Sequence, residues 1–363
     1  MQYKVIGLMS GSSLDGLDIV YVHLEESAGE WNFEIRETAC IAYSAALKEK
    51  LSGATGLSAR DYLLLHTEYG HFLGKTVNEF IEEKGLAFQV QLIASHGHTS
   101  FHLPEQRMTA QLGDGASIAA VTGIHTITDL RSTDIALGGQ GAPVVPIGEK
   151  LLFGTYDLFL NIGGIANISV LDPEPIGFDV CPANRVLNLL AANTGKGYDE
   201  DGRLASTGIV EQGLLHALNQ FAYYRESFPK SLSNDFGLKE IFPLIETAGL
   251  LQQDALRTYV EHIVVRVVEA ALQLLKKSRK EGMPGTMLVT GGGAHNRFLV
   301  EQLKTALQVI GLELIVPENE LTDYKEALII ALMGALRWRE EENVISSVTG
   351  SMRNSINGAI WSS

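Results

Sequence analysis

Two glycines and an aspartate in the middle of the chain have the types and spacing of a phosphate-transfer site. Apolar residues 158–160 and 168–171 are separated by Gly163 and Gly164, which predicts a strand, a tight glycine turn and a second strand. A glycine turn can present backbone N–H donors to an anion. Asp179 follows another short apolar run and has the chemistry of a general base. The alternative is a structural hairpin followed by an ordinary loop aspartate.

A second candidate phosphate turn lies near the N-terminus. An apolar strand at 5–8 and another at 19–22 are joined by a turn rich in small residues, hydroxyls and carboxylates. Such a turn suits phosphate with Mg²⁺, for which Asp15 and Asp18 are the candidate ligands. It does not have the Walker pattern, and a simple small-residue turn is the alternative.

A third glycine segment, residues 291–293, follows the apolar strand 287–289 and opens a helix. Glycines between a strand and a helix N-terminus allow a nucleotide to approach the backbone closely. Because these glycines are consecutive, they do not form a Rossmann fingerprint.

Polar residues also follow two strands of the N-terminal half. The strand 90–94 leads into His96 and His98, and His102 follows closely. No carboxylate accompanies them at ligand spacing, so hydrogen bonds to substrate or backbone are favoured over a metal. Arg131 follows the strand 126–128 and is flanked by aspartates, which favours a structural ion pair over a ligand clamp.

Helices with regular apolar spacing must hold these turns in place. We expect a helix over 59–84, a loop into a helix over 109–122, and a small-residue helix over 325–338. The longest helix is expected after Asp254, which can cap it. Residues 195–208 read as a polar, glycine-punctuated surface loop.

Length and composition limit the class of protein. A chain of 363 residues usually forms two domains, and small molecules tend to bind in the cleft between them. The net charge of −15 disfavours nucleic-acid and membrane-surface partners. The two cysteines, Cys40 and Cys181, are far apart and predict neither a zinc site nor a disulfide framework. No signal peptide or membrane span is recognisable, so we expect a cytoplasmic protein.

The whole chain resembles the anhydro-N-acetylmuramic acid kinases, within the actin, Hsp70 and sugar-kinase superfamily. The motifs that carry the resemblance occur in the family's order, and they are GLMSGSSLDGLD, HGHT, DLRSTDIALGGQGAPVVP, LNIGGIANIS, GFDVCPAN, YDEDGRLASTG, TGGGAHN, KEALIIAL and SVTG. The resemblance implies an α/β, two-lobed actin-like ATPase fold, also called ribonuclease H-like, with mixed sheets flanked by helices and a cleft between the lobes. We expect one lobe to contain 1–145 plus 341–363 and the other 146–340.

The resemblance also implies an activity. The family opens the 1,6-anhydro ring of anhydro-N-acetylmuramic acid with water and transfers the ATP γ-phosphate to O6, in peptidoglycan recycling. Asp179 matches the base that activates the water, and Thr99, Arg131 and Glu326 fall in motifs on the sugar side. The ATP and phosphate positions are Gly11, Ser12, Ser13, Leu14, Asp15, Gly16, Leu17, Asp18, Gly163, Gly164, Gly291, Gly292 and Gly293, with Mg²⁺ held at Asp15 and Asp18. The family also suggests a homodimer.

The chain departs from the family pattern beside the proposed base. The family usually has FDTGPGN, whereas this chain has FDVCPAN, with Val180, Cys181 and Ala183 at the changed positions. His98 stands where the family usually has glutamine. The bulkier Cys181 and Ala183 are expected to narrow or re-aim the sugar pocket. An ATP-binding homologue that acts on another amino sugar, or a non-catalytic switch of the same fold, is therefore the alternative function.

Overall fold

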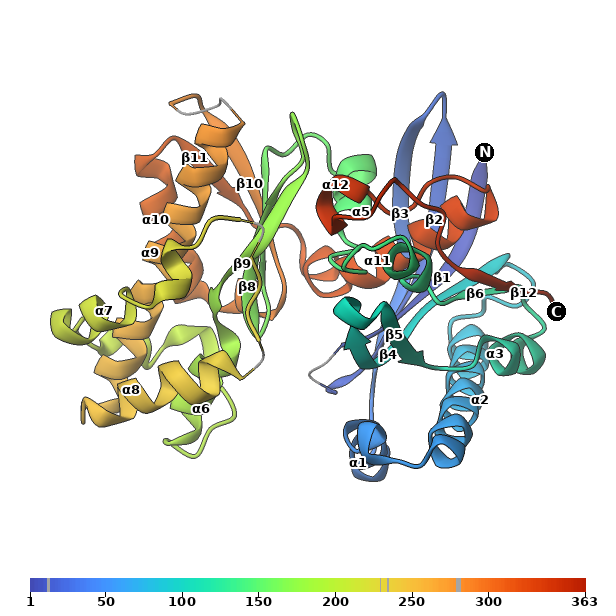
Figure 1. Cartoon of the computed structure of the whole chain (residues 1–363), viewed down its shortest axis with the longest axis horizontal. Helices are drawn as coiled ribbons and strands as arrows, with labels where there is room; N and C mark the ends of the chain where they lie inside the picture. Colours follow the sequence, from blue (N-terminus) through green and yellow to red (C-terminus); the bar gives the residue numbers. More distant parts are fainter. Residues whose placement is uncertain (12–13, 229, 234, 279–281) are drawn as a thin grey trace. The chain divides into compact units, whose positions relative to one another are not determined.

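The computed structural model describes residues 1–11, 14–228, 230–233, 235–278 and 282–363. The chain divides into two compact units (Figure 1). Unit 1 contains Met1–Phe153 and Tyr324–Ser363, and unit 2 contains Gly154–Asp323. None of the helices within the described ranges is long and apolar enough to cross a membrane.

Unit 1 is built on a mixed sheet in the order β12-β6-β4-β1-β2-β3, with β5 paired to β4. The strands β1, β2 and β3 form an antiparallel meander, and β4 and β6 continue the sheet parallel to β1. The strand bounds are β1 (Gln2–Ser10), β2 (Gly16–Ser27), β3 (Glu30–Ala42), β4 (Leu92–Leu103), β5 (Met108–Leu112), β6 (Thr126–Thr128) and β12 (Ala359–Trp361).

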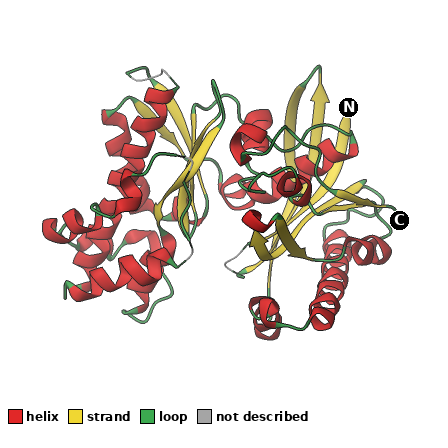
Figure 2. Ribbon diagram, viewed as in Figure 1, coloured by secondary structure: helices red, strands yellow, loops and turns green. Residues whose placement is uncertain are grey.

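Figure 2 shows the helices of unit 1 in red beside the yellow strands of this sheet. The helix bounds are α1 (Ala45–Ser52), α2 (Ala59–Glu83), α3 (Gly115–Thr122), α4 (Ser132–Ala136), α5 (Pro146–Leu152), α11 (Asn319–Trp338) and α12 (Ser346–Thr349). Helix α2 begins where the Ser58 hydroxyl accepts a hydrogen bond from the Asp61 N–H. Its apolar face, which includes Tyr69 and Leu73, packs in one core with residues of β1. The predicted helix 59–84 is thus confirmed.

Unit 2 repeats the same strand order with different residues. Its sheet runs β11-β10-β7-β8-β9, in which β7, β8 and β9 are antiparallel and β10 and β11 continue parallel to β7. The strands are β7 (Leu158–Ile162), β8 (Ile165–Val170), β9 (Ile176–Pro182), β10 (Gly285–Thr290) and β11 (Leu312–Ile315). The helices are α6 (Asn184–Ala192), α7 (Gln212–Leu218), α8 (Phe242–Thr247), α9 (Gln252–Lys277) and α10 (Arg297–Val309). Two mixed sheets with this repeated topology confirm the predicted actin-like ATPase fold.

The units are bounded differently from the expected lobes of 1–145 plus 341–363 and 146–340. Helix α5 belongs to unit 1, where Phe153 just after it packs edge-on against Phe33 of β3 at 5.4 Å. Most of α11 also belongs to unit 1, because Lys325 makes a buried 2.7 Å ion pair with Glu149 of α5. Helix α11 passes so close to β1 that a Cβ on Gly7 would overlap the Ala327 carbonyl.

Three local predictions were wrong. Residues 109–112, expected in a loop, form most of β5, because they pair with the end of β4. Asp254 does not cap α9: it lies in the first turn, and its carboxylate instead accepts the Ile209 N–H at 2.8 Å. Helix α11 begins at Asn319, six residues before the predicted start at 325.

Candidate functional site

The turn between β1 and β2 of unit 1 carries the first predicted phosphate segment. Within it, the Leu14 N–H donates to the Gly11 carbonyl at 3.3 Å, and Leu14 has a positive φ of 58°. Gly16 is required here, because a Cβ would lie 2.7 Å from the Ile41 carbonyl and 3.0 Å from Cys40 Sγ of β3. Leu17 is 1% exposed, and its side chain anchors the turn to the hydrophobic core. Ser12 and Ser13 lie outside the described residues.

The carboxylates of this turn differ in exposure. Asp15 is exposed and Asp18 is partly buried in β2, opposite Cys40 of β3. No group of three or more histidine, cysteine, aspartate or glutamate side chains that could hold a metal occurs among the described residues. Mg²⁺ bound to a nucleotide needs only one or two protein carboxylates, because phosphate oxygens and water complete its shell. The two aspartates therefore fit the predicted ion.

A β-bulge in β4 sets the directions of the two histidines in the motif SHGHT. The register of β4 against β1 shifts by one residue between Ser95 and His98, and Gly97 has a φ of +70°. His96 accepts a 2.8 Å hydrogen bond at Nε2 from Arg131 Nε, and its Nδ1 donates to the Gly97 carbonyl at 2.9 Å. Burial and the Arg131 charge lower the pKa of His96 to about 3, so the ring is a neutral support for Arg131.

Arg131 makes different contacts from those expected. It donates to the Gly141 carbonyl at 2.7 Å as well as to His96, and neither flanking aspartate forms a salt bridge with it among the described contacts. Asp134 is fully buried and accepts hydrogen bonds from the Gly141 N–H and the Thr349 hydroxyl. The prediction that Arg131 forms an ion pair with these aspartates was therefore wrong. The Asp134 carboxylate instead links Gly141 to Thr349 through hydrogen bonds.

Glu326 is the carboxylate whose charge interacts with the Arg131 guanidinium. Burial raises the pKa of Glu326, while Lys325 and Arg131 oppose that shift. Burial lowers the pKa of Arg131 to about 10, and the charge of Glu326 opposes this. The structure thus brings Arg131 and Glu326 together in unit 1.

Thr99, the third predicted sugar-side residue, lies on β4 opposite Gln111 of β5, whose side-chain amide donates to its hydroxyl at 3.5 Å. Gln111 and His96 line a cavity of about 250 Å³ that also has Asp129 and Trp361 in its wall. His96 is shared by this cavity and the Arg131 contact, so the cavity adjoins the sugar-side residues.

In unit 2, the turn between β7 and β8 places Gly163 and Gly164 as predicted. Their carbonyls accept hydrogen bonds from Asn184 and Ala183 at the start of α6. No hydrogen bond from the Gly163 or Gly164 N–H is found within the described parts of the chain. Two adjacent N–H groups without an acceptor fit the predicted anion site.

The glycine segment 291–293 packs onto the end of β7, beside this turn. A Cβ on Gly291 would overlap the Asn161 side chain, and one on Gly293 would overlap Ile162. Gly291 also has a φ of +85°. The Asn184 side-chain amide donates to the Ile162 carbonyl at 3.0 Å. The structure therefore brings the two glycine segments of unit 2 together around the end of β7.

Asp179 lies within β9 rather than at its end, next to a second β-bulge. The register of β9 against β8 gains one residue between Asp179 and Cys181, so Val180 is the extra residue. The Leu232 N–H donates to Asp179 Oδ2 at 2.8 Å, and no described group contacts Oδ1. Burial raises the pKa of Asp179, and the Leu232 hydrogen bond opposes that shift. The carboxylate is therefore oriented through Oδ2, and none of the hydrogen bonds between described residues uses Oδ1.

The changed positions beside Asp179 point into the core. Val180 is 3% exposed, and Cys181 and Ala183 are fully buried. Burial raises the pKa of the Cys181 thiol to about 12. Neither side chain therefore reaches open space in unit 2. The expectation that the two residues narrow or re-aim the sugar pocket stays a prediction.

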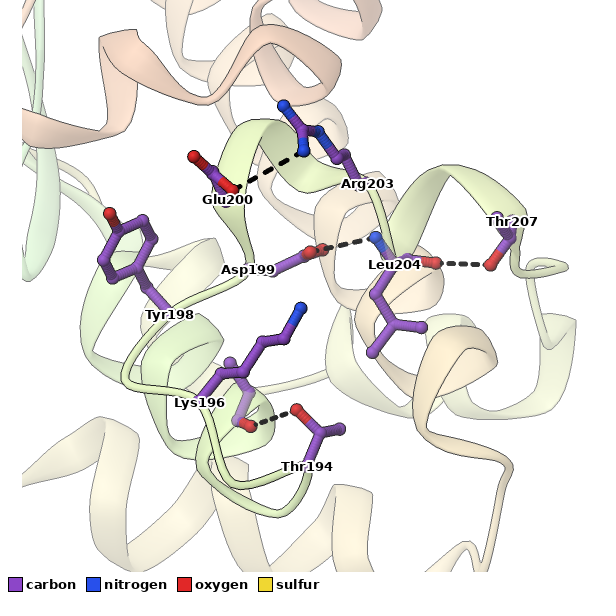
Figure 3. A pocket seen from close by; sticks show the side chains of 9 residues that line it. Thr194, Lys196, Tyr198, Asp199, Glu200, Arg203, Leu204 and Thr207 are labelled. Atoms are coloured by element: carbon purple, nitrogen blue, oxygen red, sulfur yellow. Dashed lines mark hydrogen bonds and ion pairs between the residues drawn. The ribbon is translucent and has the colours of Figure 1, made fainter.

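A hollow of about 410 Å³ lies in the loop 194–207 (Figure 3). Lys196 extends between the segments that carry Asp199 and Thr194, and the Asp199 carboxylate is held by the Leu204 and Ala205 N–H groups. More than half of residues 195–208 are exposed, which agrees with the predicted surface loop. Two short 3₁₀ turns, Glu200–Gly202 and Ala205–Thr207, give the loop its shape.

This hollow adjoins the glycine segment of unit 2. Gly202 has a φ of +67°, and a Cβ there would overlap the side chain of Asn296, which caps α10. Arg297 lies 3.5 Å from Asp201 across the same contact. Residues that follow segment 291–293 thus pack directly against the loop that forms the hollow.

The family model and the sequence relatives agree on one family. A family model described as anhydro-N-acetylmuramic acid kinase matches residues 3–363. The anhydro-N-acetylmuramic acid kinase of Aliivibrio fischeri is 34% identical and covers 99% of both chains, and that of Sulfurimonas denitrificans is 32% identical over 98% of both. The activator of the 2-hydroxyisocaproyl-CoA dehydratase from Clostridium difficile, with bound ADPNP, aligns at 17% identity with a TM-score of 0.46, over 95% of this chain and 99% of that one. The family assignment rests on the family model and the sequence relatives alone.

Proposed function

We propose, from the premise that this chain belongs to the anhydro-N-acetylmuramic acid kinase family, that it opens the 1,6-anhydro ring of that sugar with water and phosphorylates O6. The enzyme is an ATP-dependent sugar kinase, and its product is N-acetylmuramate 6-phosphate, an intermediate of peptidoglycan recycling. The observation that carries the proposal is the Asp179 carboxylate, which the Leu232 N–H orients through Oδ2 while no described residue donates a hydrogen bond to Oδ1.

Asp179 acts as the general base. It takes a proton from water as the water oxygen bonds to C1 and the C1–O6 bond breaks. The electron pair that O6 gains then attacks the γ-phosphorus, and ADP leaves. Because O6 is both leaving group and acceptor, one bound geometry serves both steps. Burial raises the pKa of Asp179, which makes its carboxylate a stronger base than that of an ordinary aspartate.

The glycine turns hold ATP. The N–H groups of Gly163 and Gly164, which have no acceptor among the described residues, bind phosphate oxygens, and the turn 11–18 of unit 1 is the second phosphate-binding segment. The segment 291–293 holds the adenosine, whose base occupies the hollow beside Gly202.

Asp15 and Asp18 would hold Mg²⁺, which would neutralise phosphate charge when bound. On the sugar side, Arg131 and Glu326 bind polar groups of the sugar, with Thr99 nearby on β4. Arginine suits a carboxylate such as the lactyl group of the muramic acid, because its guanidinium offers parallel N–H donors.

We place the enzyme in the cytoplasm, as a homodimer that binds no nucleic acid. The net charge of −15 opposes polyanions, and the two cysteines, one exposed and one buried, do not form a disulfide.

The decisive experiment supplies the purified protein with Mg-ATP and 1,6-anhydro-N-acetylmuramic acid in ¹⁸O-labelled water. We expect sugar-dependent ADP release and a phosphorylated sugar that carries one solvent oxygen. Phosphorylation of another amino sugar without solvent oxygen would instead support the alternative sugar kinase. ATP binding without any sugar-dependent turnover would support a non-catalytic switch.

A further inference from the structure

A chain of buried hydroxyl groups ends at His98, beside the N-terminal phosphate turn. Tyr43 donates to Ser10 Oγ at 2.7 Å, and Ser10 Oγ lies 3.1 Å from His98 Nδ1. Tyr69 OH lies 2.7 Å from Tyr43 OH. All four side chains are at most 6% exposed. Ser10 is the last residue of β1 and immediately precedes Gly11, so the chain ends where the phosphate turn begins.

The chain of hydroxyls can supply a proton to His98 Nδ1. Tyr43 donates its only proton to Ser10, so Tyr69 donates to Tyr43. The Ser10 hydroxyl is then placed to donate to His98 Nδ1, with Tyr69 as the other hydroxyl within its reach. When Ser10 donates to Nδ1, His98 is the neutral ring that accepts there and carries its own proton on Nε2.

The Nε2–H of His98 is left available. No described residue accepts it. Among the described residues, Arg266 Nε is the only fully buried side-chain nitrogen or oxygen that lacks a hydrogen-bond partner. His98 Nε2 also lacks a described partner, so it is not fully buried. Burial lowers the pKa of His98, which keeps the ring neutral. A single oriented N–H donor thus lies beside the phosphate turn.

We propose that His98 binds substrate, its Nε2–H donating to an acceptor oxygen of the reacting complex, and that Tyr43 and Ser10 position it. This inference rests on the proposed kinase function. Glutamine, which the family usually has here, can do the same, because its Oε1 can accept from Ser10 while its amide donates outward. The acceptor is either a phosphate oxygen of ATP or an oxygen of the sugar.

Nitrogen-15 NMR of histidine-labelled protein tests the tautomer and the contact without turnover. We expect an unprotonated Nδ1 and a protonated Nε2 for His98, assigned by its loss in His98→Gln. Addition of a non-hydrolysable ATP analogue alone, or of the sugar alone, should shift the Nε2–H signal, and the ligand that does so identifies the acceptor. A protonated Nδ1, or no shift with either ligand, would overturn the proposal. This outcome is independent of whether the sugar is phosphorylated.

Kinetics with matched variants supply the second test. His98→Leu should raise the KM for one substrate about 10- to 100-fold, whereas His98→Gln should stay within about threefold of the wild type. Tyr43→Phe should shift the His98 nitrogen signals towards a tautomer mixture. His71→Gln, on the exposed face of α2, serves as the control and should change nothing. Equal KM values for folded His98→Leu and wild type would contradict a substrate contact.

Discussion

The two units share one strand order but carry their chemistry on different strands. In unit 1 the polar side chains lie on β4, the third strand of the order β12-β6-β4-β1-β2-β3, and in unit 2 the carboxylate lies on β9, the last strand of the order β11-β10-β7-β8-β9. In both units a β-bulge adjoins the chemical residue, at Gly97 and at Val180. The repeated sheet thus supplies a common frame, and the position of one extra residue decides which side chains are re-aimed.

Burial also acts in opposite directions in the two units. It lowers the pKa of His96 and His98, so they stay neutral hydrogen-bonding groups. It raises the pKa of Asp179, so that carboxylate becomes a better base. Burial therefore keeps His96 and His98 of unit 1 neutral, as hydrogen-bonding groups, and makes Asp179 of unit 2 a stronger proton acceptor.

The largest expected effect comes from removing the base of unit 2. Asp179→Asn should lower kcat about 10²- to 10⁴-fold, the usual worth of a general base, while the Kd for ATP stays unchanged. The asparagine oxygen can still accept the Leu232 N–H, so the fold should be kept. Glu174→Gln, at an exposed position before β9, is the matched control. Full turnover by Asp179→Asn would remove Asp179 as the base.

Glycine substitutions should separate packing from ligand approach in unit 2. Gly293→Ala forces a Cβ into Ile162, which should cost about 1–3 kcal/mol of unfolding free energy. Gly163→Ala meets nothing closer than the Ile165 carbonyl at 3.4 Å, so it should leave stability nearly unchanged and weaken ATP binding. Thermal unfolding and ATP titration of both variants test this. Equal loss of stability would show that both glycines serve packing alone.

In unit 1, Arg131→Lys should raise the KM for the sugar about tenfold. Lysine cannot donate to His96 and the Gly141 carbonyl in the same fixed geometry. Arg60→Lys is the control, because that side chain is exposed in the first turn of α2 and belongs to no proposed site. An unchanged sugar KM for Arg131→Lys would limit Arg131 to a structural role.

The pH profile should report the environment of Asp179. Because the ionised form is the base, kcat should fall as pH drops through the pKa, at a higher pH than for an ordinary aspartate. The Leu232 N–H stabilises the ionised form, so Leu232→Pro should raise the pKa and move this acid limb further up in pH. The folded state binds this proton more tightly than the unfolded state, so this group alone stabilises the fold as pH falls. An acid limb that does not move in a folded Leu232→Pro would contradict the assignment.

The sequence predicted the strands and turns because their signals are local. Apolar runs and paired glycines located β7, β8 and the turn at Gly163 correctly. The bulges were not predictable, since an extra residue is visible only once both paired strands are known. Likewise, tertiary packing brings the side chains of Tyr43 and Tyr69 to Ser10, and no spacing in the sequence predicts these contacts.

One expectation failed because neighbours in sequence need not be neighbours in space. Arg131 was assigned to its sequence neighbours, yet its hydrogen-bond partners His96 and Gly141 come from other segments. The position of Cys181 was not predictable either, because the bulge at Val180 breaks the alternation of the strand, and the thiol is buried. The effect of Cys181 on the sugar pocket stays a prediction.

The smallest effect concerns the two cysteines, one in each unit. Cys40 is exposed on β3 beside the phosphate turn, whereas Cys181 is fully buried and its pKa is raised to about 12. Since the thiolate is the reactive form, native protein treated with iodoacetamide near pH 8 should gain one carbamidomethyl group, on Cys40, and the second only on unfolding. Peptide mass spectrometry locates each label. Rapid labelling of Cys181 in folded protein would show that β9, which also carries Asp179, opens to solvent. Because burial raises the pKa of Asp179, such opening would contradict the raised pKa of the base.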